Sequence, residues 1–307
     1  MTNTLTIPPY ALIIGENIAH SKSPAIHNSW LKQHNLPGSY GFRNVSSGNL
    51  REFVLEAWEK GYRGFNATIP HKEALLQFPD LISPDPIASA IGAINTVYRQ
   101  DGSNQFIGTN TDAYGWWKSL ELTHPPKNAL VIGAGGAAKA VIYALKNQGV
   151  AITITNRKPE RAAHVAGALG FALGAGFAFM SGQRGTGLIK QGAIAAAGAA
   201  VTAKFIEWMD SRIDGRGYDL IVNCTSCGTH DENPIRLTAL DPGTLVSDLV
   251  YTPLETQLLK SAREQGGVPI DGLGMLLHQA AGGFEKWFGV RPEVTEDLRR
   301  RVLTAHA

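Results

Sequence analysis

A glycine-rich turn, Gly133-Ala134-Gly135-Gly136-Ala137-Ala138, has the residue types and spacing that bind the pyrophosphate of a dinucleotide. The first glycine allows a tight turn after a strand, and the second lets the backbone approach the phosphates. The free N–H groups at the start of the next helix add a positive dipole end. A tight turn that binds another nucleotide is the competing interpretation, but the flanking strand and helix patterns favour a dinucleotide.

Basic residues follow the next expected strand, where the sequence has Asn156, Arg157 and Lys158, with Arg161 one turn later. An acid at that place would bind the ribose 2′-hydroxyl of NAD and repel a 2′-phosphate. Guanidinium groups instead make bidentate hydrogen bonds to phosphate. The sequence therefore favours NADP (NADPH) over NAD. The alternative interpretation is a solvated, basic start of a helix.

Hydroxyl, amide, lysine and carboxylate side chains gather in the first third of the chain, after expected strands or in loops. Open parallel sheets bind their ligands at such places. The set suits a small polyhydroxylated acid, although no member is specific alone and a loop lysine is often only solvated. The candidates are Ser21, Ser23, Thr68, Lys72, Asn95 and Asp112.

Strands and helices must position these residues, and the apolar patterns predict both. Strands are expected at 10–15, 129–133, 150–155, 218–223, 244–248 and 268–270, with a strand and then a turn over 64–70, and helices are expected at 24–35, 50–60, 137–148 and about 188–213. Ser23 is the expected N-cap of the first helix, with Pro24 at the first helical position. This alternation predicts an α/β protein with mainly parallel, helix-covered sheets.

The bulk numbers support a folded protein and exclude several classes of function. The chain has 307 residues, 44% hydrophobic and 18% charged, which fits two domains. A net charge of +2 gives no strong field for nucleic acid or an acidic membrane. The longest uncharged apolar run, 165–180, is shorter than the roughly 20 residues of a membrane helix.

Cysteine usage and the start of the chain indicate a cytoplasmic protein without disulfides. The N-terminal residues lack the basic and apolar regions of a signal peptide. Cys224 and Cys227 form a C-x-x-C pair, but no second pair or suitably spaced histidines accompany it. We therefore expect no metal site and no redox function there. His20, His27 and His71 flank the polar motifs and are expected to be structural.

The motifs together resemble those of the shikimate dehydrogenase family over nearly the whole chain, apart from the Gly/Ala-rich part of 170–217. The segment with Ser21 and Ser23 is similar to the family's substrate-carboxylate segment, and Asn66-Ala-Thr-Ile-Pro-His-Lys72 is similar to the segment of its catalytic lysine. Further matches are Asn223-Cys-Thr-Ser-Cys-Gly228, Asp248-Leu-Val-Tyr251-Thr-Pro253-Leu-Glu-Thr256 and Gly272-Leu-Gly-Met275-Leu-Leu-His-Gln279-Ala280.

This resemblance implies reversible, NADPH-dependent reduction of 3-dehydroshikimate to shikimate in aromatic amino-acid biosynthesis. Lys72 would be the acid–base group, through its pKa or its charge alone, and Asp112 would be its partner. The implied substrate ligands are Ser21, Ser23, Thr68, Lys72, Asn95, Asp112, Tyr251 and Gln279. The implied cofactor ligands are Gly133, Ala134, Gly135, Gly136, Ala137, Asn156, Arg157, Lys158, Arg161, Thr225, Gly272 and Met275.

The resemblance also implies two domains separated by a cleft. The substrate-binding catalytic domain would comprise 1–112 and 274–307, and the Rossmann-like NADP-binding domain 113–273. A Gly/Ala-rich insertion is expected near 170–200, and the protein would be a monomer or homodimer. Two alternatives stay open. One is a quinate/shikimate dehydrogenase of broader specificity, which Ser23 and Arg157 disfavour, and the other is a non-catalytic nucleotide-sensing relative, which Lys72 and Asp112 disfavour.

Overall fold

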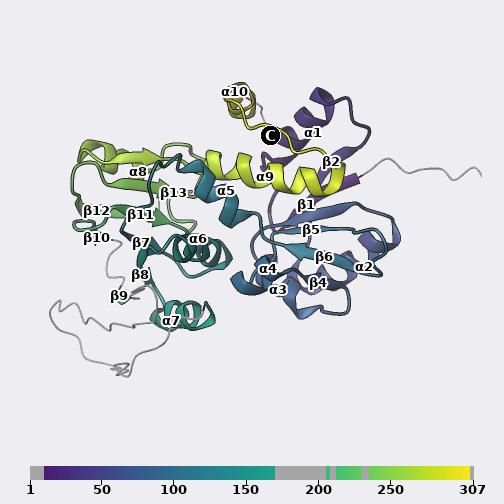
Figure 1. Ribbon diagram of the computed structural model, residues 1–307, viewed down its shortest axis with the longest axis horizontal. Helices are drawn as coiled ribbons and strands as arrows, with labels where there is room; N and C mark the ends of the chain where they lie inside the picture. Colours follow the sequence, from purple (N-terminus) through teal and green to yellow (C-terminus); the bar gives the residue numbers. More distant parts are fainter. Residues whose placement is uncertain (1–9, 170–204, 208–211, 230–234, 305–307) are drawn as a thin grey trace, which may run out of the picture. The chain divides into compact units, whose positions relative to one another are not determined.

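The computed structural model of the chain describes residues 10–169, 205–207, 212–229 and 235–304 (Figure 1). The chain divides into two compact units, one of Met1–Trp116 with Leu276–Ala307 and the other of Trp117–Met275. The division falls within helices α5 (Asp112–Ser119) and α9 (Gly272–Phe288), so both helices contribute residues to each unit. The proline-containing stretch 122–127 connects α5 to strand β7 inside the second unit.

The first unit is built on a six-stranded sheet with the order β2-β1-β3-β5-β6-β4. β1 is parallel to β2 and β3, and β4 is parallel to β6, whereas β5 is antiparallel to β3 and β6. The expected mainly parallel sheet is thus confirmed. The strands are β1 (Tyr10–Gly15), β2 (Ser39–Asn44), β3 (Gly64–Ala67), β4 (Ile82–Pro84), β5 (Thr96–Tyr98) and β6 (Phe106–Thr109).

Short helices connect these strands. They are α1 (Ser23–Gln33), α2 (Leu50–Glu59), α3 (His71–Ala74) and α4 (Pro86–Ile91), with 3-10 turns η1 (Ser47–Asn49) and η2 (Leu75–Gln77). A further helix of this unit, α10 (Glu296–Thr304), follows α9. α2 ends at Glu59, close to the predicted end at residue 60, and Gly61 after it takes a φ of +74°. Helix α1 ends at Gln33 rather than at residue 35, because Asn35 adopts a left-handed φ of 51°.

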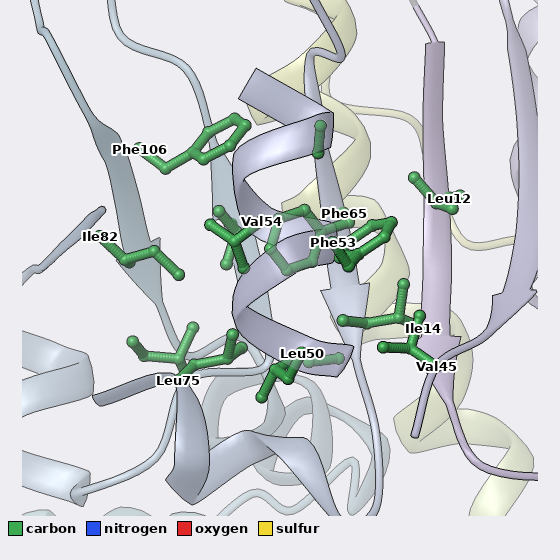
Figure 2. Close-up of a cluster of buried hydrophobic side chains, with 14 of the residues drawn as sticks. Leu12, Ile14, Val45, Leu50, Phe53, Val54, Phe65, Leu75, Ile82 and Phe106 are labelled. Carbon is green, nitrogen blue, oxygen red and sulfur yellow. The ribbon is translucent and has the colours of Figure 1, made fainter. Parts of the chain in front are cut away.

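Strand β1 is buried on both faces, and this explains its continuous apolar run. Leu12 and Ile14 join a cluster that includes Phe53 of α2 and Phe65 of β3, as Figure 2 shows. Ala11 and Ile13 face the opposite side, where Trp287 of α9 packs. Truncation of a side chain as buried as that of Phe53 to alanine costs about 3–5 kcal/mol. The sheet is therefore a rigid base for its own loops.

The second unit contains a six-stranded sheet with the order β14-β13-β11-β7-β8-β9, and all its pairs are parallel. Its strands are β7 (Asn128–Ile132), β8 (Ala151–Asn156), β9 (Phe205–Glu207), β11 (Leu220–Asn223), β13 (Leu245–Asp248) and β14 (Val268–Ile270). Its other elements are α6 (Gly136–Asn147), α7 (Pro159–Ala168), α8 (Gln257–Glu264) and the parallel pair β10 (Arg212–Asp214) and β12 (Arg236–Ala239). The strand order reverses between β7 and β11, where such sheets bind ligands.

Two further expectations are wrong. A helix was expected over about 188–213, but 205–207 form β9 and 212–214 form β10; the rest of that range lies outside the described residues. Short apolar runs do not separate strand from helix by periodicity, and pairing with β8 favours the strand at 205–207. Ser23 is not the N-cap of α1, because the helix includes Ser23 and the cap residue is Lys22.

Within the described ranges, no helix is both long and apolar enough to span a bilayer. In the same ranges, no group of three or more His, Cys, Asp or Glu side chains is placed to hold a metal ion.

Candidate active site

One edge of the first sheet carries the polar candidates. β1, β3 and β6 run in the same direction and end at this edge, so Thr68 follows β3 and Asp112 follows β6. Asn95 lies at the same edge because it comes just before β5, which is antiparallel to β3 and therefore begins where β3 ends. The backbone N–H of Ile94 also donates to the carbonyl of Lys72, at 2.7 Å. The topology thus brings together segments from separate parts of the chain.

Lys72 and Asp112 form an ion pair at this edge. Nζ of Lys72 donates to Oδ2 of Asp112 at 2.6 Å, and the two side chains are 16% and 5% exposed. Lys72 lies on the short helix α3, and Asp112 begins α5, where its N–H donates to Oδ1 of Asn110 at 3.0 Å. The pair is thus largely shielded from bulk water, and Lys72 keeps the larger exposed fraction.

Asn95 fixes the other oxygen of Asp112. Its Oδ1 accepts the backbone N–H of Thr111 at 2.8 Å, which sets the orientation of the side-chain amide. Its Nδ2 therefore faces Asp112 and donates to Oδ1 at 2.7 Å. One oxygen of Asp112 thus accepts a hydrogen bond from an ammonium group, and the other accepts one from an amide. These two bonds fix the rotamer of the carboxylate, which acts only as an acceptor.

Gln279 joins the same group from helix α9. Its Oε1 accepts from Nδ2 of Asn95 at 3.3 Å, and its Nε2 donates to the carbonyl of Leu276 at 3.1 Å. Gly115 of α5 makes this approach possible. A Cβ at residue 115 would lie 2.6 Å from the backbone nitrogen of Gln279. The first unit therefore assembles Lys72, Asn95, Asp112 and Gln279 as one hydrogen-bonded cluster.

Thr68 and Ser21 lie in loops that begin where β3 and β1 end, and Ser23 is the first residue of α1. Thr68 is held by its N–H, which donates to the carbonyl of Ile14, and its methyl group would lie 2.5 Å from a Cβ at Gly15. Oγ of Ser21 accepts the N–H of Ser23 at 3.3 Å. Ser21 is half-buried, whereas Ser23 is buried. These hydrogen bonds are local and do not join the Lys72 cluster.

A series of buried hydrogen bonds, which the sequence did not predict, holds the side chain of Asn95 in place. The hydroxyl of Tyr40 donates to Oδ1 of Asn66 at 2.7 Å, and Nδ2 of Asn66 donates to Oγ1 of Thr96 at 3.0 Å. The hydroxyl of Thr96 then donates to Oδ1 of Asn95 at 2.9 Å. Tyr40 lies on β2, an edge strand with a weak apolar pattern, so the sequence did not predict that this residue is buried in the network. Asn66 was visible in the motif beside Thr68, but only as part of the motif.

The histidines near the motifs have structural surroundings. The ring of His27 stacks on Tyr40, with centroids 4.0 Å apart, and burial lowers its pKa to about 3. His71 is buried, and its Nε2 lies 2.8 Å from the carbonyl of Val45. His20 is exposed.

The glycine-rich turn of the second unit has the geometry of a phosphate cradle. Gly133 takes a φ of +116°, and its N–H donates to the carbonyl of Thr155 at 2.8 Å. Gly135 precedes α6 with no side-chain cap, and a Cβ there would meet nothing within 4 Å. Uncapped N–H groups at the helix start and open space beside the turn are what a pyrophosphate requires.

The basic residues follow β8, next to β7 in the sheet. The side chains of Arg157, Lys158 and Arg161 are exposed, and Nδ2 of Asn156 donates to the carbonyl of Lys158 at 2.9 Å. An exposed cluster of this kind can reach a phosphate group in solvent, and salt weakens its attraction.

A buried polar network shapes the turn after β11. Oδ1 of Asn223 accepts the hydroxyl of Thr225 at 2.7 Å, and Nδ2 of Asn223 donates to Asp248 at 2.9 Å. Thr256 donates to the other oxygen of Asp248 at 2.6 Å and caps α8. Burial raises the pKa of Asp248 to about 6. The network holds Thr225 beside the glycine-rich turn, since its methyl group would lie 3.1 Å from a Cβ at Gly133.

The remaining candidates also belong to the second unit. Tyr251 follows β13 and is half-buried, and Met275 is 8% exposed in the first turns of α9. A Cβ at Gly272 would lie 2.4 Å from the carbonyl oxygen of Leu249, so the start of α9 needs glycine there. Cys224 and Cys227 are free cysteines, and burial raises the pKa of Cys224, which disfavours a reactive thiolate.

Three family models match the chain. The shikimate dehydrogenase substrate binding domain matches residues 13–97, shikimate / quinate 5-dehydrogenase matches 118–174, and the shikimate 5′-dehydrogenase C-terminal domain matches 272–303. The NADP(+) shikimate dehydrogenase of Chelativorans sp. (strain BNC1) is 42% identical over 95% of both chains.

Solved structures agree in fold. The Thermus thermophilus shikimate 5-dehydrogenase, in complex with NADP(H) and shikimate, is 31% identical, with a TM-score of 0.76 over 96% of this chain and 98% of its own. The quinate dehydrogenase of Corynebacterium glutamicum, in complex with NAD, is 27% identical, with a TM-score of 0.74 over 97% and 99%. The chain described here belongs to the shikimate dehydrogenase family.

Proposed function

We propose that the protein is a shikimate dehydrogenase, which reversibly reduces 3-dehydroshikimate to shikimate with NADPH. The observation that carries the proposal is the ion pair of Lys72 and Asp112, 2.6 Å apart within a cluster of amide side chains. A nucleotide-binding relative without catalysis would have no need of an ammonium group held at a sheet edge in this way.

The chemistry follows from the charge that develops on the ketone. When a hydride adds to the carbonyl carbon, the carbonyl oxygen becomes an alkoxide, and a nearby cation that can donate a proton lowers the barrier. Lys72 donates that proton from Nζ and takes it back in the reverse direction. Asp112 holds the ammonium group in place and accepts a substrate hydroxyl, while Asn95 and Gln279 bind other polar groups of the ring.

The proposed cofactor is NADPH, which supplies the hydride when it is bound. The open space at Gly135, the left-handed turn at Gly133 and the uncapped start of α6 fit its pyrophosphate. Arg157, with Lys158 and Arg161, provides the positive charge for the 2′-phosphate. Further proposed cofactor ligands are Ala134, Gly136, Ala137, Asn156, Thr225, Gly272 and Met275.

We assign substrate binding to 1–112 with 274–307, and cofactor binding to 113–273. Ser21 and Ser23 bind the substrate carboxylate in this proposal, with Thr68 and Tyr251 as further substrate ligands. The monomeric or homodimeric state and the cytoplasmic location stay predictions from the sequence.

Quinate oxidation is the second candidate activity, because one matched family model and one solved relative bear that name. The basic residues after β8 favour NADP, whereas that relative was solved with NAD. We therefore place shikimate with NADP first.

The direct test is shikimate-dependent reduction of NADP by the purified chain, compared with an Asp112→Asn variant. The variant cannot accept hydrogen bonds from both Lys72 and Asn95, so we expect at least about a tenfold loss of kcat. Asp101→Asn, on an exposed turn, is the control and should keep full activity. Absence of turnover in the unmodified protein would contradict the proposed function.

A further inference from the structure

Lys22 lies between the two serines that we assign to the substrate carboxylate, but its ammonium group is bonded elsewhere. Nζ of Lys22 donates to the carbonyl of Val302 at 3.0 Å, a contact between residues 280 positions apart. Lys22 is the N-cap residue of α1, and its side chain makes no cap hydrogen bond to that helix. Its side chain therefore links the start of α1 to the C-terminal helix α10.

The contact lies near the last residue of α10, where a positive charge stabilises a helix. Val302 lies two residues before Thr304, the last residue of α10 (Glu296–Thr304). A positive charge at the C-terminal end of a helix also complements its dipole. The buried side chains of α10 are Leu298 and Val302, each 1% exposed. The bond to Lys22 thus adds a polar attachment to a helix held by a narrow apolar stripe.

The same contact holds the C-terminal end of residues 18–23, which we call the serine segment. At its first end, the N–H of Ile18 donates to Oδ1 of Asn44, the last residue of β2, at 3.0 Å. Between the anchors, the N–H of Ser21 donates to the carbonyl of Ile18 at 2.9 Å. Residues 18–22 are therefore held by β2 on one side and by α10 on the other, with Ser21 between them.

We propose that Lys22 is a positioning residue that ties α10 to the serine segment and so sets Ser21 and Ser23 for the substrate carboxylate. The functional half of this inference rests on the proposed function, whereas the tether itself does not. Loss of the tether weakens substrate binding and leaves cofactor binding unchanged, because the contact lies wholly within the first unit.

The tether is tested without any ligand by amide hydrogen exchange on the full chain. Lys22→Met removes the donor and keeps the aliphatic stem, and Lys32→Met, an exposed lysine on the same helix, is the matched control. We expect exchange to be about fivefold faster at 21–26 and 298–304 in Lys22→Met alone, with 128–156 unchanged. Leu298→Ala, which loosens α10 from its apolar side, should speed exchange in the same two segments. Unchanged exchange at 21–26 in both variants overturns the tether.

The functional half is tested by steady-state kinetics of the same variants. Lys22→Met should raise the KM for shikimate about fivefold, leave the KM for NADP unchanged, and be largely restored in Lys22→Arg. An unchanged KM for shikimate, or an equal rise in both KM values, overturns the positioning role. A rise that vanishes at high salt also overturns it, because a through-space charge effect is screened whereas a tether persists.

Serine variants separate this inference from the proposed function. If Ser21→Ala and Ser23→Ala raise the KM for shikimate while Lys22→Met does not, the substrate site stands and the positioning role fails. If neither serine variant changes that KM, the assignment of the carboxylate site fails, and the exchange experiment alone then decides the tether.

Discussion

At the scale of single residues, the proposed chemistry depends on an ammonium group held by a carboxylate. Lys72 alone would be an ordinary loop lysine. The structure places it 2.6 Å from Asp112, whose second oxygen is occupied by Asn95. This arrangement removes rotamer freedom from three polar side chains before any ligand binds, which is how a site gains from preorganisation.

Replacement of Lys72 by alanine should therefore abolish most turnover. We expect kcat to fall by about 10²-fold or more, the usual range for a lost acid–base group, with folding intact. Lys60→Ala, at an exposed surface ion pair, is the control and should behave as the unmodified protein. Near-normal kcat in Lys72→Ala would remove the lysine from the mechanism.

Arg157 carries the prediction on cofactor choice. Arg157→Asp replaces a guanidinium group by a carboxylate that repels a 2′-phosphate, so the KM for NADP should rise by about tenfold or more. The KM for shikimate should change little. Arg236→Asp, an exposed arginine on β12 of the same unit, makes the same change of charge away from the turn and is the control. Equal effects of the two variants would contradict the phosphate role of Arg157.

At the scale of elements, each unit has one feature that positions its candidate ligands. Helices α5 and α9 meet at Gly115, where a Cβ would lie within 2.8 Å of three atoms of Gln279, two of them backbone. The turn after β11 is held by the buried network of Asn223, Asp248 and Thr256. In each case, close packing or hydrogen bonding of neighbouring residues fixes the position of a candidate ligand, Gln279 in the first unit and Thr225 in the second.

Gly115→Ala tests the first feature. The added methyl group must displace α9, so we expect a loss of about 1–3 kcal/mol of unfolding free energy and a higher KM for shikimate through Gln279. Gly48→Ala is the matched control, because a Cβ there would meet nothing within 4 Å. Full stability of Gly115→Ala in urea unfolding would show that the helices do not constrain each other.

Asp248 makes stability depend on pH. Burial raises its pKa from 3.8 to about 6, so its ionised form is disfavoured in the folded protein. The stabilisation is therefore complete below about pH 4 and is lost as pH rises through about 6, a change of roughly 3 kcal/mol. Asp248→Asn lacks this dependence, so its stability relative to the unmodified protein should rise between those pH values and then level off. A pH-independent difference in urea unfolding would contradict the raised pKa.

At the scale of the whole molecule, the sequence predicted the α/β class, and the strands that it predicted lie near their observed positions. These predictions succeeded where local features of the sequence determine the structure, such as the apolar run at 10–15 and the glycines around Gly133. They failed where tertiary pairing decides. The strand at 205–207 depends on pairing with β8, and Asn95 reaches its edge only because β5 is antiparallel. Tyr40 stayed hidden because one edge strand leaves almost no periodic signal.

Candidate residues followed the same division. Lys72, Asp112, Asn95 and Gln279 were predicted from motifs, and the structure joins them by hydrogen bonds. Their supports, Thr111, Thr96 and Asn66, were not predicted, because a buried polar chain has no fixed spacing along the sequence. The roles of all these residues stay predictions until variants are measured.

The most direct test of the account is the kcat/KM of the purified protein for shikimate and for quinate, each with NADP and with NAD. We predict that shikimate with NADP exceeds each other combination by at least about tenfold, because shikimate is the proposed substrate and the basic residues after β8 favour the phosphate-bearing cofactor. Equal or higher efficiency for quinate with NAD, or absence of turnover in every combination, would contradict it.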